Sequence, residues 1–185
     1  CACATRPARV PEATDLQPLH VVVGASGYIG SNLVPELLRS GRRVRATARN
    51  IEVLEGRGWA GAELARADAL DPATLPAALA GADVAYYLVH SMAAGSHFGA
   101  IDRVAAANFA RAAAAAGVRR IVYLGGLIPP NPRSQHLLSR AETGEVLRQG
   151  AVPVTEVRAG MIVGPGSAAY EVIRDLVNHL PVMVT

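Results

Sequence analysis

The sequence predicts an α/β protein whose strands form one doubly wound parallel sheet with helices on both faces. Six short apolar runs alternate with helical patterns, which is typical of parallel strands joined by right-handed crossovers. The first run leads through a glycine-rich turn into a helix. Alanine, valine, leucine and glycine dominate and aromatic residues are few, which suits alternating strands and helices. A chain of 185 residues has the length of one domain.

The expected elements follow from these patterns in order. The short segments between the helical patterns predict strands at Leu19–Val23, Arg43–Ala48, Ala62–Ala67, Val84–Val89, Arg120–Leu124 and Val152–Val157. Helical periodicity predicts helices at Tyr28–Ser40, Pro72–Ala80, Ser96–Ala116, Arg133–Gln149 and Ala168–His179, with a helical turn near Val53–Arg57. Asp71 is expected to cap its helix, and Pro35 to kink the first helix. The loops that follow the strands converge on one ligand cleft.

The glycine-rich turn carries the strongest functional signal. Strand Leu19–Val23 leads directly into Gly24-Ala25-Ser26-Gly27-Tyr28-Ile29-Gly30. The first glycine permits a tight turn, the second lets the backbone approach a pyrophosphate, and the third lets the helix pack near the strand. Free N–H groups and the positive end of the helix dipole then face the anion. The alternative is a tight turn without a ligand. The predicted dinucleotide-binding residues of this turn are Gly24, Ser26, Gly27, Tyr28, Ile29 and Gly30.

The second strand indicates which dinucleotide binds. An NAD site usually places Asp or Glu at the end of this strand, on the ribose 2′-hydroxyl. The chain has no acid between Glu36 and Glu52 and carries several arginines there. A guanidinium takes a 2′-phosphate through charge-assisted hydrogen bonds. We therefore predict NADP(H) in preference to NAD(H), with Arg49 as the first candidate for the 2′-phosphate and Arg45 as the second. The alternative is a solvated basic edge.

Further cofactor contacts are expected from the loops after the third and fourth strands. Asp68 can accept a hydrogen bond from the adenine amino group while Ala69 packs beside the ring; the alternative is a loop or cap acid. Leu88, Val89 and His90 end the fourth strand on the same cleft.

Composition excludes several kinds of chemistry. The chain contains no lysine, so it has no P-loop lysine, Schiff-base lysine or Tyr-x-x-x-Lys pair. Its net charge of +3 comes from dispersed arginines, which disfavours nucleic-acid binding. Cys1 and Cys3 lack the spacing and partners of a metal site, and we expect no metal. No run reaches the length of a membrane span, so we expect no membrane contact and a cytoplasmic location.

The organisation of the chain suggests one domain. Residues 1–17 contain prolines and no periodicity, so we expect a flexible lead-in. Residues 18–185 form the expected dinucleotide-binding domain, which we interpret as truncated at its C-terminus. The alanine-rich face of residues 104–116 would permit a homodimer; the alternative is that this face packs in the core.

Several motifs occur in an order that resembles the atypical short-chain dehydrogenase/reductases. They are the glycine-rich turn, Arg45-Ala46-Thr47-Ala48-Arg49, Asp68-Ala69-Leu70-Asp71, Tyr86-Tyr87-Leu88-Val89-His90-Ser91-Met92, Tyr123-Leu124-Gly125-Gly126-Leu127 and Arg158-Ala159-Gly160-Met161-Ile162-Val163-Gly164. The chain resembles the NmrA-like, NAD(P)H-binding branch, above all bacterial members with the Tyr-Tyr-Leu-Val-His-Ser-Met run. The resemblance covers residues 19–185. It implies a Rossmann fold with strand order 3-2-1-4-5-6 and bound NADP(H) or NAD(H).

The chain departs from the usual catalytic set of that family. Typical members carry Ser or Thr after the fifth strand and Tyr-x-x-x-Lys on the next helix, where the tyrosine donates a proton. Here Gly125 follows the fifth strand and leaves room for the nicotinamide ring, while His136 and Arg140 have the tyrosine-to-lysine spacing. An imidazole can transfer a proton near neutral pH, so His90, His136 and Arg140 are the catalytic candidates. For both histidines the alternative is a structural role.

Two polar residues on the long alanine-rich helix, Asp102 and Asn108, are expected to bond neighbouring loops; they receive no catalytic role.

Three functions remain open at this stage. The first is an NADP-dependent oxidoreductase acting on a small carbonyl or unsaturated substrate, oriented beside a hydride donor. The second is a non-catalytic NADP(H)-binding redox sensor or assembly module, which the absent Tyr-Lys pair favours. A sugar-nucleotide epimerase is weaker, because its chemistry also relies on the missing tyrosine.

Overall fold

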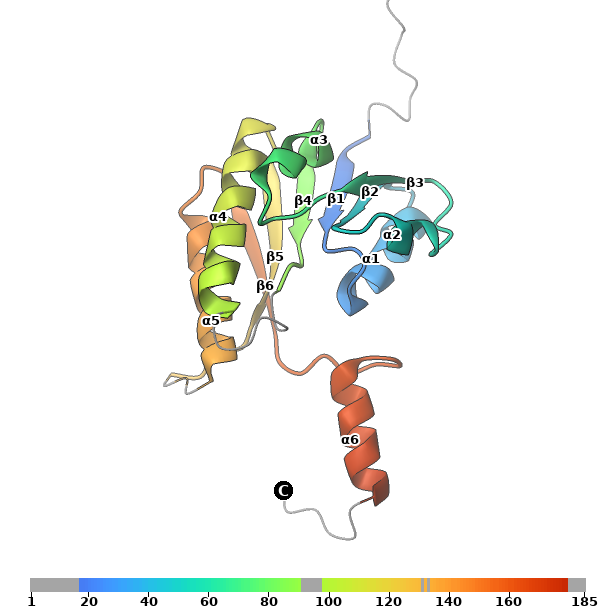
Figure 1. The fold of residues 1–185 in the computed structure, drawn as a ribbon, viewed down its shortest axis with the longest axis vertical. Helices are drawn as coiled ribbons and strands as arrows, with labels where there is room; N and C mark the ends of the chain where they lie inside the picture. The colour runs from blue at the N-terminus through green and yellow to red at the C-terminus, as the bar shows by residue number, and fades with distance from the viewer. Residues whose placement is uncertain (1–16, 91–97, 131, 133, 180–185) are drawn as a thin grey trace, which may run out of the picture.

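The computed structural model describes residues 17–90, 98–130, 132 and 134–179. Its centre is a six-stranded parallel sheet with strand order β3-β2-β1-β4-β5-β6 (Figure 1). This arrangement confirms the predicted fold class and strand order. The strands are β1 (Leu19–Val23), β2 (Arg43–Ala48), β3 (Ala62–Arg66), β4 (Val84–Tyr87), β5 (Arg120–Gly126) and β6 (Val154–Ala159).

Helices cover both faces of the sheet and enclose two separate cores (Figure 1). On one face, Val34 and Leu54 pack against β1 and β2; on the other, Leu75, Phe109 and Leu147 pack against β1, β4 and β5. Alternate residues of β1 serve the two cores, because successive strand side chains point to opposite faces. The helices are α1 (Tyr28–Arg39), α2 (Glu52–Glu55), α3 (Leu75–Leu79), α4 (Phe98–Ala115), α5 (Gln135–Arg148) and α6 (Ala168–His179), and a short 3-10 turn, η2 (Pro72–Thr74), precedes α3.

Strand pairing explains where the expected strand ends were wrong. Strand β4 ends at Tyr87, opposite the last residue of β1, Val23, although the apolar run continues to Val89. Strand β5 continues beyond Leu124 because Gly125 and Gly126 pair with β6. The sequence run alone does not show where a neighbouring strand stops.

Helix ends agree with their local signals in most places. The Asp71 carboxylate accepts a hydrogen bond from the Ala73 N–H at 3.2 Å and caps η2 as expected. Helix α1 continues through Pro35 to Arg39. Helix α5 begins at Gln135, two residues later than predicted. Residues 96 and 97, with which the long helix was expected to begin, and residues 1–16 of the expected lead-in lie outside the described residues.

Two close backbone approaches fix the glycine-rich turn, one to helix α1 and one to the segment after β4. Gly24 has φ +91°, and a Cβ there would lie 3.1 Å from the carbonyl carbon of Leu88. A Cβ on Gly30 would lie 2.5 Å from the Cα of Ala25 and 2.6 Å from the Gly24 oxygen. Both neighbours are backbone and cannot rotate away. These glycines therefore place the first turn of α1 at the carboxyl edge of β1 and beside β4.

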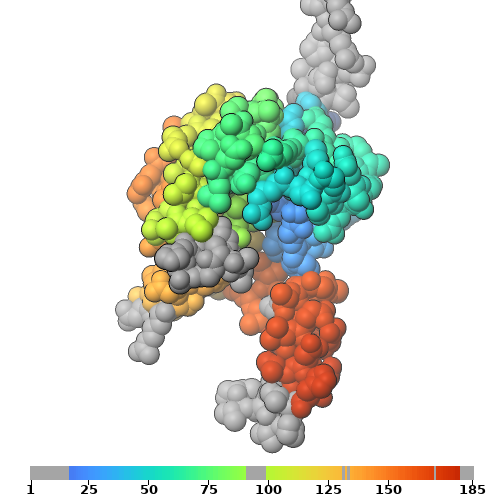
Figure 2. All heavy atoms as spheres, viewed as in Figure 1, coloured from blue at the N-terminus to red at the C-terminus, as the bar shows by residue number. Residues whose placement is uncertain are grey.

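Helix α6 stands apart from the sheet (Figures 1 and 2). It carries exposed apolar side chains, among them Val172, Leu176 and Val177. Across the described part of the chain, none of the helices combines the length and the apolar character needed to cross a membrane.

The contact at Gly30 predicts a sharp difference between two glycine variants. Gly30→Ala should lower the free energy of unfolding by about 1–3 kcal/mol, because its new methyl group meets backbone. Gly27→Ala should change it little, since a Cβ there meets only the Gly24 oxygen at 3.5 Å. Urea unfolding of both variants tests this. Equal stability losses would contradict the close helix–turn packing.

Candidate functional site

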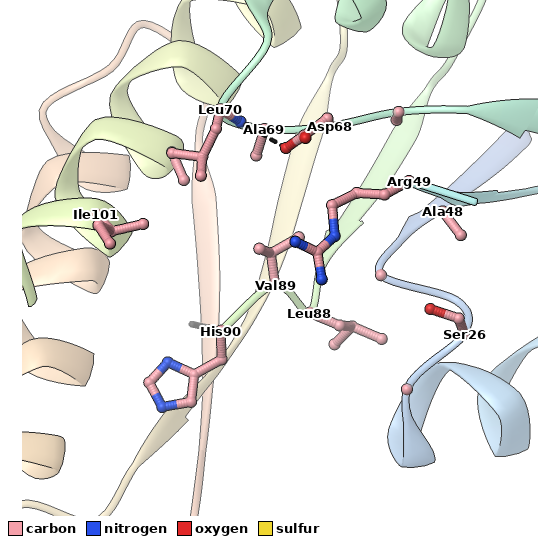
Figure 3. Close-up of a pocket in the computed structure, with 14 residues that line it drawn as sticks. Ser26, Ala48, Arg49, Asp68, Ala69, Leu70, Leu88, Val89, His90 and Ile101 are labelled. Carbon is pink, nitrogen blue, oxygen red and sulfur yellow. Dashed lines mark hydrogen bonds between the residues drawn. The ribbon is translucent and has the colours of Figure 1, made fainter. Parts of the chain in front are cut away.

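A cavity of about 450 Å³ opens at the carboxyl edge of the sheet, between the glycine-rich turn and helix α4 (Figure 3). Its walls come from the loops after β1, β2, β3 and β4, as expected for a doubly wound sheet. Ile101 and Ala105 of α4 close the side opposite the turn. Nine of the residues predicted to bind the cofactor line this cavity: Gly24, Ser26, Gly27, Arg49, Asp68, Ala69, Leu88, Val89 and His90.

The glycine-rich turn leaves the start of α1 open to an anion. Gly27 is the N-cap residue with φ −74°, a conformation open to any residue. Because a Cβ there would make only an ordinary contact, 3.5 Å from the Gly24 oxygen, the packing of the protein does not require glycine. Among the described residues no side chain caps α1, and its first turn carries no acid. The first N–H groups and the positive end of the dipole therefore suit a phosphate.

The two arginines expected near the 2′-phosphate lie in different surroundings. Arg49 follows β2 and extends over the cavity toward Leu88 and Val89 (Figure 3). Arg45 is not among the cavity-lining residues. Its Nε donates to the Glu63 carboxylate at 2.9 Å, and its Nη1 donates to the Ala80 carbonyl at 2.8 Å. The Arg45 guanidinium thus joins β2 to β3 and to the end of α3, which leaves Arg49 as the candidate that faces the cavity.

A third arginine, which the sequence reasoning did not select, lies near the turn. Nη2 of Arg57 is 3.4 Å from the backbone oxygen of Ser26. The arginine follows α2, and no local pattern connects it with the glycine-rich turn. Only the folded arrangement brings the two together.

The loop after β3 is held in place by hydrogen bonds from two elements. Thr74 accepts from the Asp68 N–H at 2.9 Å, and Asn108 of α4 donates to the Ala69 carbonyl at 3.0 Å. The expectation that Asn108 bonds a neighbouring loop is confirmed. The Asp68 carboxylate accepts from the Leu70 N–H at 2.9 Å (Figure 3). This wall of the cavity is therefore fixed before any ligand binds.

A smaller cavity of about 60 Å³ adjoins the first. Leu88, Val89 and His90 line both, so the two are continuous along the segment after β4. Ile29 and Arg140 also line the smaller cavity. Tyr28 and Gly30 line neither cavity: Gly30 packs under the turn, and a Cβ on Gly164 would lie 2.5 Å from the hydroxyl oxygen of Tyr28.

The three predicted catalytic residues meet beside this smaller cavity. Nε2 of His90 lies 3.0 Å from Nδ1 of His136, and the Arg140 Nε donates to the other ring nitrogen of His136 at 3.3 Å. Arg140 also donates to the Leu124 carbonyl at 2.9 Å. Nδ1 of His90 lies 2.8 Å from the carboxylate of Asp102. Asp102 thus bonds the segment after β4, as expected of a structural residue. Ser91, the next polar residue of the signature run, lies outside the described residues.

Burial affects the histidines and the nearby tyrosines differently as proton carriers. It lowers the pKa of His90 and of His136, and the positive charge of Arg140 lowers both pKa values further. Burial also raises the pKa of Tyr123 to about 12 and raises that of Tyr87. Both histidines are therefore neutral near pH 7, and neither phenol is activated.

Gly125 of β5 packs closely against a side chain of the neighbouring strand β6. A Cβ on Gly125 would lie 2.4 Å from Oε1 of Glu156, a half-buried carboxylate that bonds Arg148 at 2.7 Å and Arg158 at 3.1 Å. The freed space accommodates this protein group, and Gly125 lines neither cavity. At Gly126 the nearest atoms to a Cβ include Cδ of Arg140 at 3.4 Å.

A family model described as NAD(P)H-binding matches residues 24–176. The chain belongs to this NAD(P)H-binding family. The match begins at Gly24 and covers every segment that lines the two cavities.

Curated relatives carry the names of reductases. The chain is 32% identical over 170 residues to a (4-alkanoyl-5-oxo-2,5-dihydrofuran-3-yl)methyl phosphate reductase of Streptomyces griseus subsp. griseus, covering 88% of this chain and 56% of that protein. It is 37% identical over 123 residues to cinnamoyl-CoA reductase 1 of Oryza sativa subsp. japonica, covering 62% and 36% respectively. The chain thus spans about half the length of the first relative and about a third of the second.

A solved structure shares the fold and the cofactor class. The triphenylmethane reductase of Citrobacter sp., complexed with NADP(H), superimposes with a TM-score of 0.67 at 26% identity. The match covers 77% of this chain and 49% of that one. The family match shows that this chain belongs to a family described as NAD(P)H-binding, and the solved structure shares its fold.

The lowered histidine pKa values predict a loss of stability in mild acid. The unfolded chain binds more protons than the folded protein below the ordinary histidine pKa of 6.5. The free energy of unfolding should therefore fall as the pH drops below about 6.5, to which buried His20 contributes in the same direction. In His136→Gln this decline should be smaller. Urea unfolding at several pH values tests it, with His179→Gln on exposed α6 as the control; identical declines in the wild type and His136→Gln would refute it.

Proposed function

We propose that this protein is an NADP(H)-dependent oxidoreductase that reduces a small carbonyl or conjugated unsaturated substrate. One observation carries the proposal: the glycine-rich turn and Arg49 line the same cavity, and that cavity leads to a hydrogen-bonded pair of histidines. The reductase names of the relatives and the NADP(H) complex of a structural neighbour support it.

Residues of the larger cavity would hold the cofactor. The N–H groups at the start of α1 suit the pyrophosphate, and Gly27 leaves space for its approach. The Asp68 carboxylate lies on the wall suited to the adenine. Leu88 and Val89 give apolar contacts where the two cavities join. When bound, the reduced nicotinamide supplies a hydride, and the protein supplies orientation and electrostatics.

The proposed preference for NADP(H) rests on the charges around the end of β2. Arg49 lines the cavity, and hydrogen bonds or ion pairs to it are absent from the described part of the chain. The nearby acid Glu63 is occupied by Arg45 and Arg43. A guanidinium that no protein group occupies favours a phosphate over a hydroxyl. Arg57 would add positive charge to the same edge.

His136 is the proposed proton-transfer group, with Arg140 beside it for the ribose or a phosphate. His136 has the sequence position that tyrosine holds in the resembled family. His90 has both ring nitrogens engaged, one by Asp102 and one by His136, so it acts through His136. A neutral imidazole near pH 7 suits general acid–base catalysis.

The second candidate is a non-catalytic NADP(H) sensor. The absence of any Tyr-x-x-x-Lys pair favours it, and so does the Arg140 contact that covers the outer nitrogen of His136.

We further propose that the protein belongs to the NmrA-like branch, lies in the cytoplasm and forms a homodimer, and that it binds neither nucleic acid nor a membrane. The alanines expected at a dimer face pack in the core instead, because Ala105, Ala106, Ala110 and Ala113 are all buried. This favours the alternative reading of that helix face.

Arg49→Ala should separate the two cofactors. The variant loses the charge-assisted bonds to the 2′-phosphate, so its affinity for NADPH should fall about tenfold or more, while that for NADH changes little. Isothermal titration calorimetry with both cofactors measures this. Arg119→Ala, which removes an exposed arginine paired with Asp83 away from the cavity, is the control. Equal losses of affinity for NADPH and NADH in Arg49→Ala would contradict the proposal that Arg49 binds the 2′-phosphate.

The oxidoreductase and the sensor differ in turnover. The full-length protein should oxidise NADPH in the presence of at least one member of a panel of aldehydes, ketones and enones. His136→Gln should lower kcat about 100-fold and leave NADPH affinity unchanged. Gly27→Ala, whose methyl group enters the cradle, should lose affinity while keeping its Tm. Tight NADPH binding without turnover on any member of the panel would favour the sensor.

A further inference from the structure

A buried carboxylate outside both cavities touches the histidine pair. Asp102 lies on α4 and is 3% exposed. Its Oδ2 accepts a hydrogen bond from the Ser139 hydroxyl of α5 at 3.0 Å, and Ser139 is itself 2% exposed. The same oxygen lies 2.8 Å from Nδ1 of His90. A buried carboxylate is costly unless it is hydrogen-bonded, and here two partners from separate elements converge on one oxygen.

These contacts continue into a chain of four groups, which we call the histidine wire: Asp102, His90, His136 and Arg140. A carboxylate only accepts hydrogen bonds, so Nδ1 of His90 carries a proton and its Nε2 is an acceptor. Nδ1 of His136, 3.0 Å away, must then donate. The outer nitrogen of His136, Nε2, remains an acceptor.

Arg140, at the opposite end of the histidine wire, independently requires the same proton positions. An arginine side chain has donors and no acceptor, and the Arg140 Nε lies 3.3 Å from Nε2 of His136. That nitrogen must therefore be unprotonated, and the proton of His136 must lie on Nδ1. Asp102 and Arg140 therefore require the same tautomers. Two neutral imidazoles between them have one arrangement of protons that satisfies all three contacts, with the proton on Nδ1 of each ring. Burial lowers the pKa of both histidines, which keeps them in the neutral form that this arrangement needs.

We propose that Asp102 is a positioning residue that sets the tautomers of His90 and His136, so that His136 presents Nε2 as the proton-transferring atom. Its catalytic consequence rests on the proposed function. During oxidation of an alcohol, the substrate hydroxyl replaces Arg140 as the partner of Nε2 and gives it a proton, while the substrate carbon would give a hydride to the oxidised nicotinamide. His136 passes its Nδ1 proton to Nε2 of His90, and the positive charge then lies beside the Asp102 carboxylate. Reduction reverses each transfer, and the proton reaches the substrate oxygen as the hydride reaches its carbon.

The direct test is the tautomer of each histidine, which needs no turnover. Nitrogen-15 NMR of the full-length protein, labelled at histidine, distinguishes protonated from unprotonated ring nitrogens. The wild type should show protonated Nδ1 and unprotonated Nε2 on both His90 and His136. Most free neutral imidazole side chains carry the proton on Nε2, so two adjacent Nδ1–H forms are a specific signature. Protonated Nε2 on either residue would overturn the proposal.

Variants then test whether Asp102 is the cause. In Asp102→Ala, the preference for the Nδ1–H form should weaken on His90 and, through it, on His136, because Arg140 alone then opposes the Nε2–H form. Asp102→Asn, which keeps the volume, should weaken the Nδ1–H preference if the alanine variant does not fold. Glu142→Gln is the matched control, because it removes the exposed pair between Glu142 of α5 and Arg103 of α4, next to Asp102 in sequence. Unchanged tautomers in both Asp102 variants would assign the signature to Arg140 alone and refute the role of Asp102.

Kinetics separate this inference from the proposed function. If the protein turns over, Asp102→Ala should lower kcat about 10- to 100-fold with little change in KM or in NADPH affinity, whereas Glu142→Gln should match the wild type. An unchanged kcat would refute the catalytic consequence. If no substrate is reduced, the proposed function fails, and the NMR signature alone decides whether Asp102 sets the tautomers.

Discussion

The site depends on how closely helix α1 approaches its own turn. At Gly30 the helix backbone touches the turn, and at Gly24 the turn touches the backbone of Leu88 after β4. These contacts join three segments without any side chain between them. They bring the open N–H groups of α1 and the apolar segment after β4 to the walls of one cavity. A methyl group at either glycine would push these segments apart, so the cradle and the path toward the histidines share one geometric requirement.

Acidic residues determine which guanidinium groups are available to bind a phosphate. Glu63 holds Arg45, and Glu156 holds Arg148 and Arg158. The first of these pairs removes an arginine only four residues from Arg49. The effect of these pairs on the site is to fix where each guanidinium lies. The arginines of this stretch look alike in the sequence. In the structure, Arg49 lines the cavity, whereas Arg45 is bound to Glu63 of the neighbouring strand.

Local patterns predicted the strands, the parallel sheet and the glycine-rich turn, whereas the strand order was implied by the resemblance to the short-chain dehydrogenase/reductases. Six apolar runs specify the strands, and a glycine turn before a helical pattern specifies the cradle. The features that the sequence did not show have a different origin. The partner of Arg45 lies on another strand, the carboxylate beside Gly125 comes from β6, and β4 ends where β1 does. Such contacts depend on the register between neighbouring strands, which cannot be predicted from the periodicity of a single segment.

The same reasoning explains why Asp102 carried no catalytic meaning in the sequence. Asp102 lies on an alanine-rich helix, 12 residues after His90 and 34 residues before His136. No sequence motif links these three residues. Yet a chain without lysine has no ammonium to lower the pKa of a tyrosine, and burial raises those of Tyr87 and Tyr123. Proton transfer near neutral pH then falls to imidazole. An imidazole has two nitrogens, so it works in one direction only if a neighbour decides which one holds the proton. A buried carboxylate at one end of the histidine wire and a guanidinium at the other make that decision together.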